Sequence, residues 1–199
     1  ELDTDGSLKG YTPKKKSSKK KSSDKSATSD KSGTSTAKKS VALTFDDGPS
    51  SFTDRLLDCL EENNAKATFF MVGTEIASFP DEVKRMKKLG CELGNHTYDH
   101  KDLATLSSDE ISSEIARVDE QLENLTGEGS SVVRPPYGSV NDTVKSTVGT
   151  PMILWSIDTL DWKTQDVEST VEEVMNNVKD GSIILMHDIF STSVDAAEI

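Results

Sequence analysis

From Ser40 onward, short apolar segments alternate with stretches of helical periodicity, and this alternation restricts the fold more than any other feature of the sequence. The apolar segments comprise residues 41–45, 67–73, 91–96, 131–136, 152–158 and 182–187. Helical spacing predicts helices over residues 53–63, 81–90, 107–127, 139–148 and 167–181. Strands that are apolar on both faces and separated by helices indicate a parallel sheet covered by helices, in the α/β class.

Two of the predicted helices carry their own start and stop signals. Pro80 precedes the helix at 81–90, and Gly90 ends it. In the helix at 107–127, Ser107 and the glutamate three residues later form a capping box, and a glycine ends the helix.

Polar side chains cluster at the carboxyl ends of the predicted strands. They are Asp46, Asp47, His96, Arg134, Asp158, Asp161 and His187. Sites of βα proteins lie at this edge of the sheet. Six strand ends that face one mouth favour a barrel over an open, doubly wound sheet.

The chain divides into three parts with different compositions. Residues 1–11 resemble the end of an upstream segment, and residues 40–199 form the folded domain. Residues 12–39 are mostly Lys, Ser and Thr, without an aromatic side chain. Such a stretch cannot bury enough surface to offset chain entropy, which predicts a flexible basic linker. Adhesion to an anionic polymer is the functional alternative.

Charge and hydropathy exclude two classes of function. Residues 1–40 carry a net charge of +6, and residues 41–199 carry −18. A domain this acidic repels phosphate backbones, so we expect no nucleic-acid partner. No apolar run approaches the roughly 18–20 residues that cross a bilayer, so we expect no membrane-spanning segment.

The two cysteines, Cys59 and Cys91, are predicted to be buried free thiols, with a disulfide as the alternative.

A metal site is suggested by His96 and His100, four residues apart, and by the pair Asp46-Asp47 directly after a strand. One aspartate and two histidines supply three ligands and leave room for water, as a catalytic zinc site requires. The second aspartate is then free to act as a base. Zn²⁺ is the favoured ion, and the same donors also suit Co²⁺, Ni²⁺ or Fe²⁺. The alternative for Asp46-Asp47 is a helix cap with a turn.

Five short motifs occur in order at these strand ends: TFDDGP (44–49), HTYDH (96–100), RPPYG (134–138), DTLDW (158–162) and LMH (185–187). In this order they resemble the NodB-type polysaccharide deacetylases, carbohydrate esterase family four, over about residues 40–199. The resemblance implies a distorted (β/α) barrel and the removal of acetyl groups from sugars in polymers.

The resemblance also implies roles for five residues of the first three motifs. It makes Asp47, His96 and His100 the ligands of one divalent metal ion. It makes Asp46 the general base that deprotonates the attacking water. Arg134 would pair with Asp46 and keep it ionised and oriented.

For the remaining groups, the resemblance implies acid catalysis and substrate binding. His187 would be the general acid that protonates the leaving amine, and Asp161 would keep it protonated near neutral pH. The backbone N–H of Tyr137 would stabilise the oxyanion. Trp162 and Leu185 would line a pocket for the acetyl methyl group. Asp158 is expected to be structural.

The favoured substrate is N-acetylglucosamine in peptidoglycan, and chitin oligomers and acetylxylan are the alternatives. A non-catalytic glycan-binding module is a further alternative, although no ligand, base or acid is missing. We expect an extracytoplasmic monomer whose partner is the polysaccharide.

The closing helix, strand and helix of the family's barrel are expected to be missing after residue 199, which predicts an unpaired sheet edge and poor stability for this length of chain.

Overall fold

Six parallel strands form between residues 39 and 199, the part of the chain that the computed structural model describes; the interpretations of residues 1–38 lie outside it. The strands are β1 (Ala42–Asp46), β2 (Thr68–Met71), β3 (Glu92–Asn95), β4 (Val132–Val133), β5 (Ile157–Asp158) and β6 (Ile183–His187). The α-helices are α1 (Thr53–Glu62), α2 (Gly73–Ile76), α3 (Pro80–Leu89), α4 (Ser108–Thr126), α5 (Asp142–Thr147), α6 (Asp161–Thr164), α7 (Val167–Asn177) and α8 (Ser191–Ala197). Two 3₁₀ turns complete the list, η1 (Leu103–Thr105) and η2 (Pro136–Gly138).

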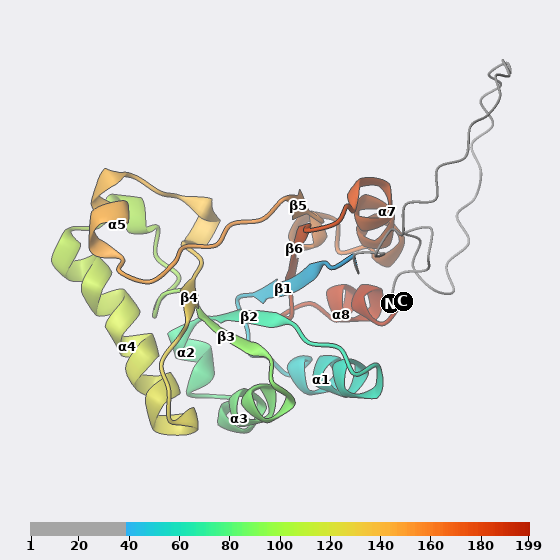
Figure 1. Ribbon diagram of the computed structural model, residues 1–199, viewed down its shortest axis with the longest axis horizontal. Helices are drawn as coiled ribbons and strands as arrows, with labels where there is room; N and C mark the ends of the chain where they lie inside the picture. Colours follow the sequence, from blue (N-terminus) through green and yellow to red (C-terminus); the bar gives the residue numbers. More distant parts are fainter. Residues whose placement is uncertain (1–38) are drawn as a thin grey trace, which may run out of the picture.

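The strands lie in one sheet in the order β4-β3-β2-β1-β6-β5, and every pair is parallel. Helices surround this sheet: α1 and α3 lie below it, α4 runs along its left side, and α7 and α8 lie to its right (Figure 1). The predicted α/β class with a parallel sheet is therefore confirmed. No helix within residues 39–199 combines the length and the apolar character that crossing a bilayer requires.

One segment connects the two edges of the sheet. Its first part pairs with β4, because the Val133 N–H donates to the Pro151 carbonyl at 2.9 Å and the Ile153 N–H donates to the Val133 carbonyl at 2.9 Å. Its last part is β5, which pairs with β6. The segment at 151–158 thus passes from one edge strand to the other side of the sheet, which agrees with the predicted distorted barrel.

Several predicted elements are shorter than the apolar runs indicated. The strand expected at 131–136 covers only Val132–Val133, since Pro135 and Pro136 have no N–H for a ladder. The strand expected at 152–158 is reduced to an isolated bridge at Met152 and the two residues of β5, because its two ends pair with different strands. The helix expected at 139–148 begins only at Asp142, and the helix expected at 167–181 ends at Asn177.

The helix signals in the sequence are confirmed. The Ser107 hydroxyl accepts from the Glu110 N–H, and the Glu110 carboxylate accepts from the Ser107 N–H, which completes the capping box of α4. Gly90 and Gly127 end α3 and α4 with φ of 77° and 86°. Both cysteines are free.

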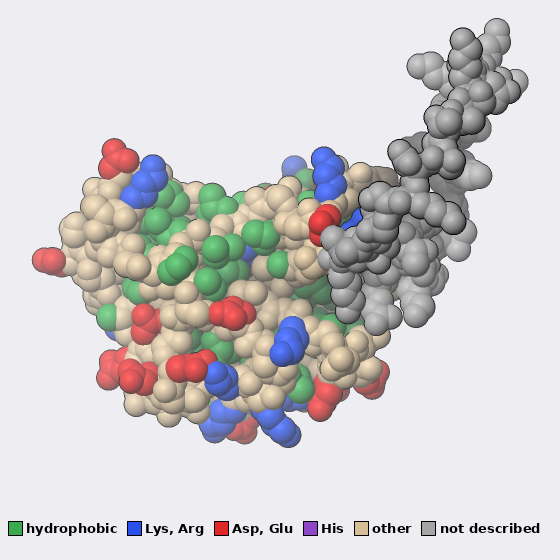
Figure 2. Space-filling view, in the orientation of Figure 1, with side chains coloured by type: hydrophobic (Ala, Val, Ile, Leu, Met, Phe, Trp, Pro, Cys, Tyr) green, Lys and Arg blue, Asp and Glu red, His purple; other side chains and the backbone are tan. Residues whose placement is uncertain are grey.

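The main core lies between the sheet and the helices around it. Phe45 and Phe69 stack at its centre with ring centroids 5.6 Å apart. In the space-filling view, hydrophobic side chains also gather in the upper middle of the visible face, between the α5 and α7 ends, with charged side chains around them (Figure 2).

Leu57 of α1 is fully buried in this core. Leu57→Ala is expected to lower the free energy of unfolding by about 2–5 kcal/mol, because it removes buried methyl groups and leaves a cavity. Urea unfolding followed by circular dichroism measures this loss. Leu154→Ala is the control, since Leu154 is 44% exposed, and it should lose much less. Equal losses in the two variants would contradict this assignment of the core.

Candidate active site

Neighbouring strands bring the predicted polar residues to one edge of the sheet. Asp46 is the last residue of β1 and lies opposite His187, the last residue of β6. His96 follows β3 directly, and Arg134 follows β4. Parallel pairing places these four carboxyl-terminal positions together, although they are far apart in the sequence.

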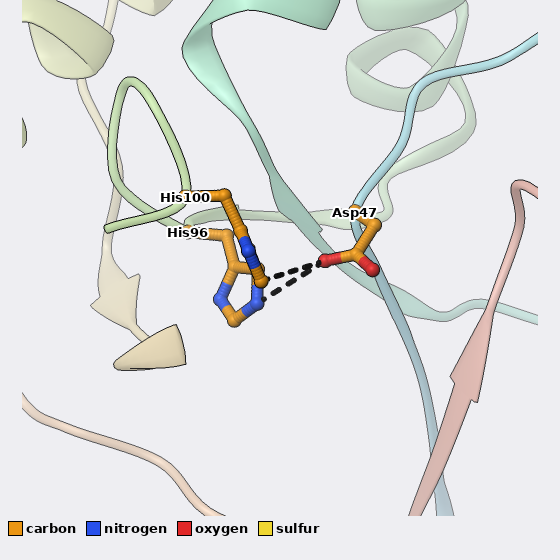
Figure 3. A group of neighbouring side chains, drawn as sticks. All are labelled: Asp47, His96 and His100. Atoms are coloured by element: carbon orange, nitrogen blue, oxygen red, sulfur yellow. Dashed lines mark ion pairs between the residues drawn. The ribbon is translucent and has the colours of Figure 1, made fainter. Parts of the chain in front are cut away.

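Asp47, His96 and His100 point toward one another (Figure 3). The Oδ1 atom of Asp47 lies 3.4 Å from Nε2 of His96 and 3.2 Å from Nε2 of His100. One ligand atom from each residue lies within 4.8 Å of the other two, so the group could hold a metal ion. The same Oδ1 atom is buried and has no hydrogen-bond partner among the described residues. One carboxylate and two imidazoles are ligands that suit a divalent transition metal, and the unpartnered Oδ1 atom of Asp47 is free to bind it.

The surroundings of the histidines favour ligation through Nε2. Nδ1 of His96 lies 2.6 Å from the Arg134 carbonyl. A carbonyl only accepts, so this nitrogen carries the proton and Nε2 keeps its lone pair for a ligand. Nδ1 of His100 lies 3.3 Å from the Tyr137 hydroxyl. Asp47 and His100 both adopt left-handed backbone conformations, with φ of 71° and 54°, which turn their side chains toward the site.

Burial and charge act in opposite directions on the two aspartates. Burial alone would raise the pKa of Asp47, but the His100 and His96 imidazoles outweigh it and hold this pKa well below its ordinary value. For Asp46, burial prevails: it raises the pKa, although His96 and Arg134 oppose the rise. The two adjacent carboxyl groups therefore differ in proton affinity.

Arg134 is fully buried and holds Asp46 in place. Its Nη1 donates to Oδ1 of Asp46 at 2.6 Å and to the Thr44 hydroxyl at 2.8 Å. Its Nε and Nη2 donate to the Ile153 and Leu154 carbonyls, where the connecting segment crosses from β4 toward β6. Only Oδ2 of Asp46 then remains directed at the metal ligands, 3.7 Å from Nε2 of His96.

His187 and Asp161 form a second buried pair. Nδ1 of His187 lies 2.8 Å from Oδ1 of Asp161, and Oδ2 of Asp161 accepts from the His187 N–H and from the Ser193 hydroxyl. Burial alone would lower the pKa of His187 and raise that of Asp161. The contact between them outweighs burial in both, so the pKa of His187 is raised and that of Asp161 is lowered. The pair therefore favours imidazolium with carboxylate.

The three expected substrate-binding residues lie in different environments. Tyr137 is 70% exposed, and its ring meets that of His100 edge-on at a centroid distance of 4.9 Å. Trp162 is 49% exposed on α6, whereas Leu185 is only 4% exposed within β6. Asp158 accepts from the Leu160 N–H, which stabilises the turn before α6.

Two buried acidic residues near the site were not singled out by the sequence analysis. Asp188 is fully buried, accepts from the Thr53 hydroxyl at 2.5 Å, and has its pKa raised to about 7 by burial. A Cβ on Gly48 would lie 2.1 Å from Oδ1 of Asp188, so only glycine fits there. Glu114 occupies the buried stripe of α4 with Ile111 and Val118. A glutamate among apolar residues at helical spacing was the signal that could have revealed Glu114.

Comparison with known proteins gives consistent matches. The sequence profile described as "Polysaccharide deacetylase" matches residues 33–150. The peptidoglycan-N-acetylmuramic acid deacetylase PdaC of Bacillus subtilis is 41% identical over 162 residues, which cover 81% of this chain and 35% of that protein. The peptidoglycan-N-acetylglucosamine deacetylase PgdA of Listeria monocytogenes is 42% identical over 156 residues, which cover 78% and 34%. The chain thus spans about a third of the length of these two relatives.

A solved structure of peptidoglycan deacetylase PdaC from Bacillus subtilis superimposes with a TM-score of 0.78 at 41% identity, covering 80% of each chain. The five ordered motifs, the parallel sheet and the profile match agree with one another. The chain belongs to the NodB-type polysaccharide deacetylases, carbohydrate esterase family four.

Proposed function

We propose that this chain is a metal-dependent hydrolase that removes N-acetyl groups from amino sugars of peptidoglycan, with Zn²⁺ bound by Asp47, His96 and His100. One observation carries the proposal: these three side chains meet at the sheet edge where the Asp46–Arg134 and His187–Asp161 pairs also lie. The names of the two relatives support peptidoglycan as the substrate class. Action on this polymer would require a location outside the cytoplasm, with the polysaccharide as the partner. We propose a monomer.

Asp47, His96 and His100 would hold the metal, and Zn²⁺ at such a site would polarise a carbonyl and lower the pKa of water toward neutrality. Asp46 would accept the proton of the attacking water. Its Oδ1 is occupied by the Arg134 guanidinium, so the proton goes to Oδ2, the oxygen that faces the ligands. Burial raises the pKa of this carboxyl, which strengthens it as a base.

His187 would donate the proton that the leaving nitrogen needs, because an amine is a poor leaving group. Its Nδ1 is occupied by Asp161, so Nε2 is the donating atom. The backbone N–H of Tyr137 has no acceptor within residues 39–199 and would stabilise the oxyanion. Trp162, exposed on α6, and Leu185 would contact the acetyl group or the sugar.

The acid role of His187 predicts a specific change in pH dependence. His187 must be protonated to act, so activity falls as the pH rises through its raised pKa. Asp161→Asn removes the carboxylate that raises this pKa. In a plot of kcat against pH, the alkaline limb should therefore move toward lower pH by about 1–3 pH units. Asp158→Asn is the control, since the Asp158 side chain accepts from the Leu160 N–H in the turn before α6, and it should leave the limb in place. An unmoved limb in Asp161→Asn would contradict the assignment.

The reaction and the sugar are tested by acetate release from peptidoglycan, chitooligosaccharides and acetylxylan, followed by mass spectrometry of the peptidoglycan fragments. We expect release from peptidoglycan with loss of acetyl from N-acetylglucosamine. Loss from N-acetylmuramic acid would instead match the activity in the name of PdaC. Glycan binding without acetate release by the metal-loaded protein would favour a non-catalytic module and overturn the proposal.

A further inference from the structure

We propose that Glu114 is a positioning residue that holds the loop of residues 97–100 in the conformation in which His100 reaches the metal. The inference rests on the proposed function, because it assigns a role toward the metal site described above. Glu114 lies on α4 and belongs to none of the five motifs.

The loop needs external support because its backbone is strained. Thr97 and His100 both have positive φ, 66° and 54°, and neither is a glycine. A left-handed conformation is unfavourable for a non-glycine residue, and it persists only where the surrounding contacts determine it. The two strained residues flank Tyr98 and Asp99. The contacts of Tyr98 and Asp99 therefore decide whether His100 stays beside Asp47.

Glu114 supplies these contacts. Its Oε2 accepts from the Tyr98 N–H at 3.0 Å and from the Asp99 N–H at 2.9 Å. Its Oε1 accepts from Nζ of Lys101 at 2.8 Å, just beyond His100. One carboxylate thus contacts the chain on both sides of this ligand. Hydrogen bonds to a charged acceptor are about twice as strong as neutral ones.

Two further side chains contact the loop: Oδ1 of Asn95 accepts from the Thr97 N–H, and the Arg117 guanidinium lies over the Tyr98 ring. On the side that faces α2, the contacts are made by backbone groups. The Gly73 and Thr74 N–H groups donate to the Thr97 and Tyr98 carbonyls. These contacts engage the loop's acceptors, whereas its donors at Tyr98 and Asp99 depend on Glu114. Without Glu114 these donors would lose their partner on a loop that is already strained.

The burial of Glu114 points to the same role. Only 4% of this residue is exposed, although it carries a carboxylate. An apolar residue at this position of the α4 stripe would pack against the core at no electrostatic cost. The carboxylate instead accepts from Tyr98 and Asp99 of the loop and from Lys101 next to it. His96 differs, because it follows β3 directly and its ring is held by the Arg134 carbonyl. The influence of Glu114 should therefore reach the metal mainly through His100.

The test measures Zn²⁺ affinity of the full 199-residue chain by competition with a chromophoric chelator, together with stability by urea unfolding. Glu114→Ala should weaken Zn²⁺ binding about 10- to 100-fold, the range for groups that orient metal ligands. Glu114→Gln retains one oxygen for the two N–H groups and should recover most of the lost affinity. Ser107→Ala is the matched control, because it removes the cap of the same helix without touching the loop.

The outcomes separate the inference from the proposed function. If the wild-type chain binds no Zn²⁺, the proposed function itself fails. If the wild type binds and Glu114→Ala binds equally well, or no more weakly than Ser107→Ala, the positioning role is wrong. If Glu114→Ala does not fold, Glu114→Asp takes its place, because its shorter side chain cannot reach both N–H groups. Unchanged affinity in a folded Glu114→Asp would then overturn the inference.

Discussion

His96→Ala is expected to abolish retention of the metal and to lower deacetylation by about 10³-fold or more. His96 supplies one of three ligand atoms, and its ring is held by the Arg134 carbonyl, so the variant leaves only two of the three ligands. Stabilisation of transition-state charge by a catalytic metal amounts to several kcal/mol. Each 1.36 kcal/mol corresponds to a factor of ten in rate. Elemental analysis of the purified variant, beside acetate release from peptidoglycan, measures both effects.

The variant should keep its fold, because His96 lies at the edge of the sheet rather than in the core between the helices. It leaves the Arg134 carbonyl without its donor, which costs about 1–3 kcal/mol. Thermal unfolding followed by circular dichroism separates this loss from the loss of metal. A folded His96→Ala protein that holds one equivalent of metal would show that the three-residue site is wrong.

Asp46→Asn is expected to keep the metal and to lower kcat by about 10²- to 10⁴-fold, the usual contribution of a general base. Asparagine has the shape of aspartate, and its oxygen can still accept from Nη1 of Arg134. Its amide nitrogen then occupies the place of Oδ2 and cannot take up a proton. Metal content and kcat, measured on the same preparation, test this division of roles.

The two variants serve as controls for each other, since Asp46 and His96 lie side by side at the site but differ in their assigned roles. Full activity of Asp46→Asn would contradict the assignment of Asp46 as the general base. Loss of metal from Asp46→Asn would make Asp46 a ligand rather than a base. A pattern in which only His96→Ala loses metal while both lose turnover is the expected result.

Much of the fold could be predicted because its signals are local. The apolar runs and the capping box of α4 depend on residues close in sequence. They predicted the correct class, and the ends of α3 and α4 to within one residue. The strand expected at 152–158 was wrong in extent because its pairing partners are distant. Met152 pairs with Val133 of β4, whereas β5 pairs with β6. No local pattern in the sequence distinguishes these two partners.

The sequence by itself predicted that a parallel sheet would bring Asp46, Asp47, His96, Arg134 and His187 to one edge. The reason is that a helix between two strands favours parallel pairing, and each of these residues stands at the carboxyl end of a strand. Only the tertiary structure decided how that edge is arranged. The left-handed backbone at Asp47 directs the Asp47 carboxylate at the histidines, and the buried guanidinium of Arg134 binds the carboxylate of Asp46. Glu114 supports the His100 loop from a helix outside the motifs. The physical reason is that burial and hydrogen-bond partners are set by neighbours in space, which the order of residues along the chain does not specify.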